Sequence, residues 1–192
     1  MPRSARIVYP GVPHHVTQHG NNNQYILKSD TFKKKLLELI RVRIEIHDIQ
    51  VISYCIMDNH YHFIVTPQDM EAMAKTFGEV SMMFSQYYNS ITGSAGHVWK
   101  DRYFSYPLDR EHFYEAVRYV EMNPVRAELV KDPLDYKWSS AKSHINNIND
   151  PLITGTHELL EDIDDWHGYL LNKPDEIKVS KIQKKVKIGR PH

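Results

Sequence analysis

The amino-acid sequence predicts an α+β fold of the ferredoxin-like, split βαβ type. We expect a four- to five-stranded antiparallel sheet, helices packed on it, and one further helix after the last strand. Segments with strand and helix patterns follow one another in the order strand, helix, strand, strand, helix, strand, helix. The chain of 192 residues has an ordinary globular composition and is long enough for one well-packed core.

The first strand and the first helix are expected over residues 14–19 and 29–48. The stretch HHVTQH alternates and contains Val and Thr, which favour strands, and the GNNN after it is a loop. In the helical stretch, apolar residues recur three and four positions apart: Leu36, Leu37, Ile40 and Ile44. Ser29 or Asp30 is available as the N-cap.

A hairpin and a second long helix are expected next. Residues 49–57 and 60–65 have the composition of strands, and the Asp-Asn pair between them forms a two-residue turn. The following helix spans 69–92, is bent or broken at Gly78, and ends at Gly93.

The fourth strand is expected over 97–108, and Asp109 caps a helix that runs to about Met122. Pro124 interrupts this helix, because the residue before a proline is pushed out of the α region. The same proline suits the first position of a fresh helical turn, as in NPVRAELV.

The periodic patterns then weaken, so we expect a domain over 1–145 and an extension over 146–192 with an acidic helical stretch and a basic tail. Charge is segregated along the chain although the formal net charge is zero. Residues 1–43 carry a net +6, 128–172 a net −6, and 173–192 a net +5. Because a polyanion responds to the local field, this distribution permits DNA binding without requiring it.

The sequence also indicates the cellular compartment. The lone Cys55 lies in an apolar segment and cannot form an internal disulfide, which fits a bacterial-type cytoplasm. The N-terminus has charges but no apolar signal region, and the longest apolar runs are only strand-sized. We therefore expect a cytoplasmic protein without a membrane partner.

The stretch CIMDNHYHFIV places His60 and His62 two positions apart on an expected strand, so both imidazoles project from one face. The pair is either a metal clip or two partly buried histidines bonded to backbone groups. On the helix that follows the last strand, Tyr119 and Asn123 are one turn apart and share a face. Two imidazoles and an amide oxygen, without any thiolate, suit Mg²⁺ or Mn²⁺ and do not exclude Zn²⁺.

Each of these residues also has a structural reading. Asn123 before Pro124 could be an N-cap, and a helical tyrosine such as Tyr119 is usually a packing residue. Spacing alone leaves other tyrosines as alternative nucleophiles: Tyr103, Tyr106 and Tyr114. Tyr114 lies about 140° round the helix from Tyr119, so the two cannot serve one site equally. A barrel-type metal hydrolase is excluded, because that architecture needs about 250 residues.

Five blocks occur in one order between Tyr9 and His144: YPGVPHHVTQHGNNNQ, SYCIMDNHYHFIV, GHVWKDRYFSYPL, RYVEMNPVRAELV and YKWSSAKSH. Together they resemble the HUH single-tyrosine transposases of insertion sequences, and among these the REP-associated tyrosine transposases of bacteria. Each block alone is weak, but five in the same order are specific. By this resemblance, 1–145 is a catalytic domain and the helix after the last strand is the catalytic helix.

The resemblance implies a role for each residue of the constellation. His60 and His62 would hold a divalent cation, Mg²⁺ or Mn²⁺, with Asn123 as the third protein ligand. Tyr119 would attack a phosphodiester of single-stranded DNA, which yields a 5′-phosphotyrosyl enzyme and a free 3′-hydroxyl. The covalent intermediate keeps the bond energy, so a second 3′-hydroxyl can rejoin strands without ATP. The chain would act as a monomer or as a homodimer that exchanges catalytic helices.

Three departures from the family pattern stand out. The family usually has an arginine where His19 stands, a proline where Asp58 stands, and Gln-Gly where Lys100-Asp101 stand. Asp58 either closes the turn or adds a carboxylate beside the histidine pair. The replacements at His19, Asp58 and Lys100 favour an alternative function, a catalytically silent, domesticated DNA-binding protein that recognises palindromic repeats.

Proteins of this type recognise hairpins formed by extragenic palindromic repeats, which implies single-stranded or hairpin DNA as the partner and a nucleoid-associated location. The basic residues expected to contact DNA are Arg3, Arg6, Lys33, Lys34, Lys100, Arg102, Arg118 and Arg126. Three aromatic residues either stack on unpaired bases or belong to the core: Trp99, Tyr103 and Phe104. The basic tail KKVKIGRPH resembles a Gly-Arg-Pro element of longer family members.

Overall fold

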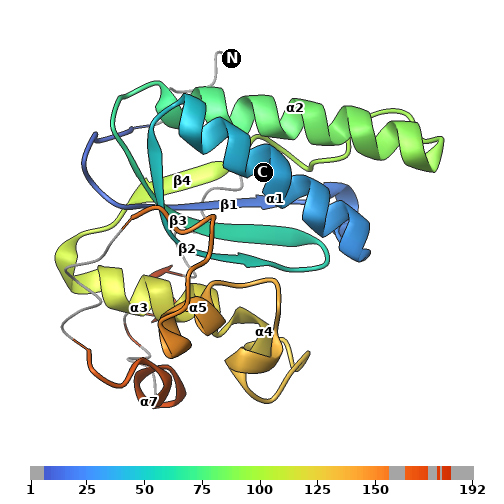
Figure 1. The fold of residues 1–192 in the computed structure, drawn as a ribbon. Coiled ribbons are helices and arrows are strands. Elements are labelled where there is room, and N and C mark those ends of the chain that lie inside the picture. Colours follow the sequence, from blue (N-terminus) through green and yellow to red (C-terminus); the bar gives the residue numbers. More distant parts are fainter. Residues whose placement is uncertain (1–6, 156–162, 173–176, 178, 183–192) are drawn as a thin grey trace.

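The computed structural model of the chain describes residues 7–155, 163–172, 177 and 179–182. The described residues form three layers, in which a four-stranded sheet separates two long helices from a group of shorter ones (Figure 1). Arg3, Arg6 and the basic tail lie outside the described residues. In the part of the chain that is described, no helix combines the length and the hydropathy needed to cross a membrane.

The strands of the sheet are β1 (His14–His19), β2 (Ile49–Ile56), β3 (His60–Pro67) and β4 (Phe104–Pro107). Their order is β2-β3-β1-β4, and every pairing is antiparallel. This is the order of a split βαβ fold, so the predicted α+β, ferredoxin-like class is confirmed. It places β1 and β3, which carry the histidines, side by side in the centre of the sheet.

Two long helices, α1 (Asp30–Ile46) and α2 (Ala72–Thr92), cover one face of the sheet (Figure 1). Ser29 is the N-cap of α1, and its hydroxyl accepts a hydrogen bond from a backbone N–H of the first turn. The predicted break at Gly78 is wrong, because α2 runs through it as one helix. A single glycine costs a helix about 1 kcal/mol, which the packing of α2 on the core outweighs. Gly93 ends α2 as predicted, with a φ of 66°.

The last strand and the hairpin turn differ from the prediction in length. Only Phe104–Pro107 pairs with β1, whereas Trp99 forms an isolated bridge with Gly20. The Trp99 indole N–H donates to the Ser81 carbonyl of α2 at 3.2 Å, and the Lys100 amide donates to the His19 carbonyl at 2.9 Å, so α2 and the end of β1 together hold the segment before β4. The connection between β2 and β3 covers 57–59, one residue more than predicted.

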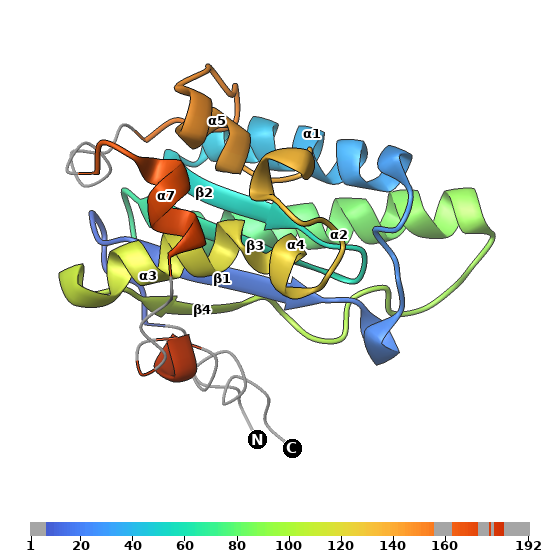
Figure 2. The ribbon, with the colours of Figure 1, turned by 90° about the horizontal axis from the view of Figure 1, so that it is seen from below.

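The opposite face carries α3 (Arg110–Glu121), α4 (Asn123–Arg126), α5 (Ala141–Asn146) and α7 (Trp166–Leu171). The described residues also include two 3₁₀ turns, η1 (Asn21–Asn23) and η2 (Pro133–Asp135). Figure 2 shows α3 lying across the sheet with the shorter helices around it. Asp109 caps α3 as predicted. The N-cap reading of Asn123 is wrong, because its side-chain amide donates back to the Tyr119 carbonyl at 3.3 Å and no side chain caps α4.

The two faces of the sheet differ in chemistry. Tyr61 and Phe63 of β3 point toward α2, where their rings lie 6.3 and 6.2 Å from that of Phe77. Because side chains alternate along a strand, His60 and His62 point the other way, toward α3. The apolar core therefore fills the α2 side, and a polar cluster lies under α3.

Candidate active site

The histidine pair of β3 and the tyrosine of α3 meet between the sheet and the helix. The rings of His60 and His62 lie 4.9 Å apart between centroids. The Tyr119 ring is 5.7 Å from that of His62 and nearly perpendicular to it, at 89°. Tyr119 is buried, with 9% of its surface exposed, because α3 packs this side against β2 and β3.

The neighbouring strand adds two more histidines to this face. Register pairs His19 with His60 and Thr17 with His62, so His15 and His19 project toward α3 as well. The His19 ring stacks on that of His60 at 4.7 Å, and His15 Nε2 lies 2.9 Å from His62 Nδ1. The sequence analysis missed the part played by His15. The signal available was the i, i+4 spacing of two histidines on a strand, but their partners depend on strand register.

Three of these imidazoles, those of His15, His60 and His62, are held neutral near pH 7. Burial lowers the pKa of His15 to about 3, and the charge of Arg126 acts in the same direction. Burial, His19 and Arg126 together lower the pKa of His60 to about 3. Burial also holds the pKa of His62 well below its usual value, with the neighbouring histidines adding to the effect. Neutral imidazole is the form that binds metal ions.

One imidazole has its tautomer assigned by a neighbouring amide. His60 Nδ1 lies 2.6 Å from the Asn59 side-chain oxygen. An amide oxygen only accepts, so Nδ1 carries the proton and Nε2 keeps its lone pair. A histidine that donates one ring N–H to an oxygen and offers the other nitrogen is the usual arrangement at metal sites.

Arg126 packs on the ring of Tyr119. The guanidinium carbon lies 3.7 Å from the centre of the phenol ring, a cation–π distance. Arg126 also forms a hydrogen bond with the Tyr119 side chain. The residue as a whole is exposed, whereas burial of the guanidinium lowers the pKa of Arg126 from its usual value.

The donors present fit a divalent cation bound with few protein ligands. Asn123 is 7% exposed, lies one turn after Tyr119, and keeps its amide oxygen as an acceptor. Within the described ranges, no three His, Cys, Asp or Glu side chains are grouped to hold a metal ion. An ion here would therefore need the Asn123 oxygen and non-protein oxygens besides the imidazoles. Such a set suits Mg²⁺ or Mn²⁺.

Comparison with known proteins places this geometry in a family. The profile of the family described as "Transposase IS200 like" matches residues 9–123, more than half of the chain. The chain belongs to the IS200-like transposase family. The match includes both histidines of β3, Tyr119 and Asn123. No curated protein matches the sequence.

Solved structures agree with the fold of an IS200-like transposase. The structure of a REP-associated tyrosine transposase bound to a REP hairpin matches with a TM-score of 0.61 at 17% identity, covering 81% of this chain and 93% of that chain. A protein of Deinococcus radiodurans R1 assigned as a transposase matches with a TM-score of 0.42 at 15% identity, covering 63% of this chain and 96% of that chain. At these identities the first match supports the fold alone, and the second carries no argument.

In the structure, the ammonium of Lys33 is buried and pairs with the carboxylate of Asp58. The Lys33 side chain is 5% exposed, and its Nζ lies 2.6 Å from Asp58 Oδ1. The rings of Tyr136 and Trp138 lie 5.8 and 5.9 Å from the same ammonium. Asp58 therefore anchors α1 to the hairpin turn, because its carboxylate pairs with the Lys33 ammonium. With its ammonium buried and paired in this way, Lys33 is not a proposed DNA contact.

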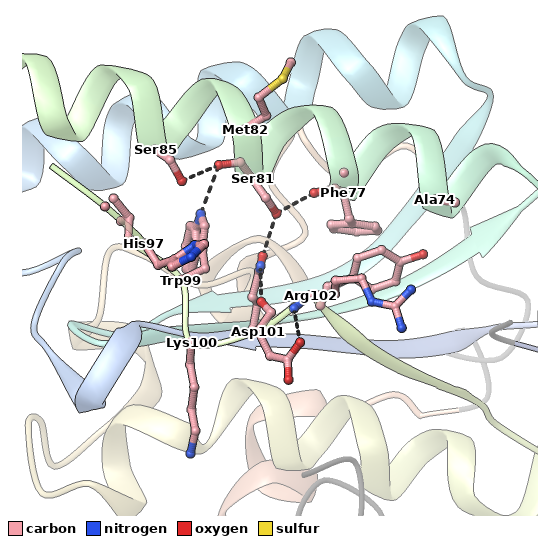
Figure 3. Close-up of a pocket in the computed structure, with 15 residues that line it drawn as sticks. Ala74, Phe77, Ser81, Met82, Ser85, His97, Trp99, Lys100, Asp101 and Arg102 are labelled. Carbon is pink, nitrogen blue, oxygen red and sulfur yellow. Dashed lines mark hydrogen bonds between the residues drawn. The ribbon is translucent and has the colours of Figure 1, made fainter. Parts of the chain in front are cut away.

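The other predicted DNA contacts divide by exposure. Lys34, Lys100 and Arg102 are exposed. Arg118 is 5% exposed, lies 3.7 Å from Glu115, and faces the Tyr169 ring of α7 at 5.3 Å, so it points away from the histidines. The Lys100 amide donates to the carbonyl of His19, which brings Lys100 to the end of β1. Figure 3 shows its side chain extending away from α2 toward the α3 side.

A cavity of about 570 Å³ lies on the other face of the sheet, between α2 and residues 96–103 (Figure 3). Its lining includes Gln18, Ser81 and Trp99. Trp99 and Tyr103 are buried there, so they serve the core rather than an open stacking platform. The cavity is separated from Tyr119 by the sheet, and we do not assign the chemistry to it.

Proposed function

We propose that this transposase is a single-stranded DNA endonuclease and strand transferase that cleaves beside REP-type hairpins. The observation that carries the proposal is the meeting of the Tyr119 phenol with the neutral imidazole of His62, at 5.7 Å between rings. The family and the likeness to a hairpin-bound relative support it. Residues 1–145 would form the catalytic domain, with 146–192 as an extension.

In the proposed reaction, the Tyr119 oxygen loses its proton and attacks a DNA phosphorus atom. The bond from phosphorus to O3′ breaks, O3′ takes up a proton, and the 5′-phosphate remains on tyrosine. A divalent cation bound by His60, His62 and Asn123 would supply charge neutralisation at the phosphate. Attack by another 3′-hydroxyl reverses the step and releases Tyr119, so strand transfer consumes neither water nor ATP.

Arg126 is placed to act on both partners of this reaction. Its guanidinium lies against the Tyr119 ring, and the residue as a whole is exposed. It packs on the phenol ring, and its planar donors match phosphate oxygens. Lys100 and Arg102, exposed beside the end of β1, would hold the flanking DNA backbone. Contacts to phosphate position the strand and do not read its sequence.

The proposal is tested by covalent adduct formation. Purified protein is incubated with single-stranded oligonucleotides that carry a palindromic hairpin, in Mg²⁺ or Mn²⁺, and resolved on a denaturing gel. The wild type should form a denaturant-resistant adduct that Tyr119→Phe abolishes. Tyr114→Phe is the matched control, since Tyr114 is half-buried on the same helix and packs on Phe113. An adduct that survives in Tyr119→Phe would refute the assignment of the nucleophile.

The burial of Tyr119 against Arg126 also favours a second function. A phenol that is 9% exposed beneath Arg126, together with His19 in place of the usual arginine, fits a DNA-binding protein that no longer cleaves. In that case the hairpin binds with the same affinity to wild type and Tyr119→Phe, and no adduct forms with either metal ion. An adduct with the wild type excludes this second function.

A further inference from the structure

Three buried side chains from three strands form a hydrogen-bonded chain that ends at the histidine pair. Tyr106 of β4 and His15 of β1 are register partners, and the Tyr106 hydroxyl lies 2.9 Å from His15 Nδ1. The other ring nitrogen of His15 lies 2.9 Å from His62 Nδ1 on β3. Tyr106, His15 and His62 are 7%, 0% and 2% exposed, so water does not compete for these contacts.

A neutral imidazole has one donor and one acceptor nitrogen. The hydrogen bonds that join Tyr106, His15 and His62 therefore allow only two consistent arrangements of their protons. In the first, Tyr106 donates to His15 Nδ1 and His15 Nε2–H donates to His62 Nδ1. The second ring nitrogen of His62 then carries its proton and cannot bind a metal ion. In the second arrangement, His62 Nδ1–H donates to His15 Nε2, and His15 Nδ1–H donates to the Tyr106 oxygen. His62 Nε2 then offers a lone pair.

We propose that His15 is a positioning residue that holds His62 as the Nδ1–H tautomer and so presents His62 Nε2 to the cation. The role of the cation rests on the proposed function, but the tautomer of His62 is a property of the protein alone. His60 shows the same design, because the Asn59 oxygen accepts from its Nδ1 at 2.6 Å. Each imidazole of the pair thus has an acceptor at Nδ1, an amide for one and a neighbouring imidazole for the other.

The Asn59 oxygen and the His15 nitrogen differ in how firmly each fixes the proton of its partner. The Asn59 oxygen can only accept, whereas His15 accepts at Nε2 only while its Nδ1 proton is directed at Tyr106. The orientation of His62 therefore depends on β1 and β4, as well as on its own strand. The His15–His62 contact is a diagonal one, because register places Thr17 and not His15 opposite His62.

The first test measures the tautomer without any metal ion. In the full chain labelled with ¹⁵N-histidine, the ring nitrogen shifts of His62 should show a protonated Nδ1 and an unprotonated Nε2. His62 resonances are assigned by their loss in His62→Gln. An Nε2–H tautomer of His62 in the metal-free wild type would overturn the proposal. This reading stands even when no metal ion binds, so it separates failure of the proposal from failure of the proposed function.

The second test measures Mn²⁺ affinity by titration calorimetry. His15→Phe removes the acceptor but keeps a flat ring, and should weaken Mn²⁺ binding ten- to a hundredfold, about the usual effect of losing such a partner. His15→Gln offers an amide oxygen and should restore the affinity to within about threefold, a rescue that a purely structural role would not produce. Thr17→Val, on the same face of β1, is the matched control and should leave the affinity unchanged. Equal affinity in His15→Phe and wild type would refute the proposal.

Discussion

The pairing of Lys33 with Asp58 makes a sharp prediction about stability. The ammonium of Lys33 is 5% exposed and reaches Asp58 at 2.6 Å, whereas Asp58 is 31% exposed. Asp58→Asn removes the negative charge and leaves the buried ammonium without its counter-ion. Lys33→Met removes the cation and keeps most of the buried aliphatic volume. The two changes therefore should not have equal costs.

The magnitude follows from the burial of the two partners. Breaking a fully buried pair by removing one partner costs about 3–5 kcal/mol. Solvent reaches Asp58, and two aromatic rings near 6 Å still face the ammonium, so we expect about 2 kcal/mol for Asp58→Asn. Lys33→Met should cost about 1 kcal/mol, and the double variant about the same, because no charge is then left unpaired. The coupling between the two sites is then about 2 kcal/mol.

The assay is urea denaturation followed by far-UV circular dichroism, analysed as a double-mutant cycle. The control is Lys35→Met, which breaks the more exposed Lys35–Glu38 pair at 3.1 Å and should cost less than about 0.5 kcal/mol. If Asp58→Asn costs the same in the Lys33→Met background as in the wild type, the two charges do not interact and the reasoning is wrong. Hairpin affinity should be unchanged in Lys33→Met, and a clear loss would return Lys33 to the DNA contacts.

Three further predictions concern the same layers. Glu121 is fully buried and accepts from Ser140 at 2.5 Å and from the Trp166 indole at 2.8 Å, so Glu121→Gln should cost about 3 kcal/mol in urea denaturation. Burial alone would lower the pKa of His144, but the Glu121 carboxylate at 2.6 Å raises it above its usual value. The free energy of unfolding of the wild type should therefore exceed that of His144→Gln by its full amount below pH 6.5, and this difference should disappear as the pH rises through the folded pKa of His144. A difference that grows from pH 6 to pH 9 would contradict the predicted direction. Lys100→Ala should lower the salt slope of hairpin binding by about 0.7–0.9, and an unchanged slope would exclude a phosphate contact.

Features that depend on neighbours in the chain could be predicted from the sequence. Ser29 and Asp109 accept hydrogen bonds from backbone N–H groups a turn away, and Gly93 takes a left-handed conformation, so short segments determine these helix ends. The order of strands and helices followed from hydrophobic periodicity. The common face of His60 and His62 followed from the alternation of a strand.

Other features depend on groups far apart in the chain, and only the tertiary structure decided them. Lys33 reads as an exposed base on an amphipathic helix, and its burial depends on a carboxylate 25 residues later. The residues before β4 look like a strand, but Trp99 forms an isolated bridge with Gly20 and its indole N–H donates to the Ser81 carbonyl of α2. Local pattern carries no information on which of several competing long-range contacts is formed.

The candidate site has features of both kinds, some set by neighbours in the chain and others by distant residues. That His60 and His62 share a face, and that Tyr119 and Asn123 share another, is local and was available from spacing. That His15 lies 2.9 Å from His62 depends on the register between strands 47 residues apart. A shift of one residue would turn every side chain of β1 to the other face, so the partner of His62 is decided only when the sheet has formed.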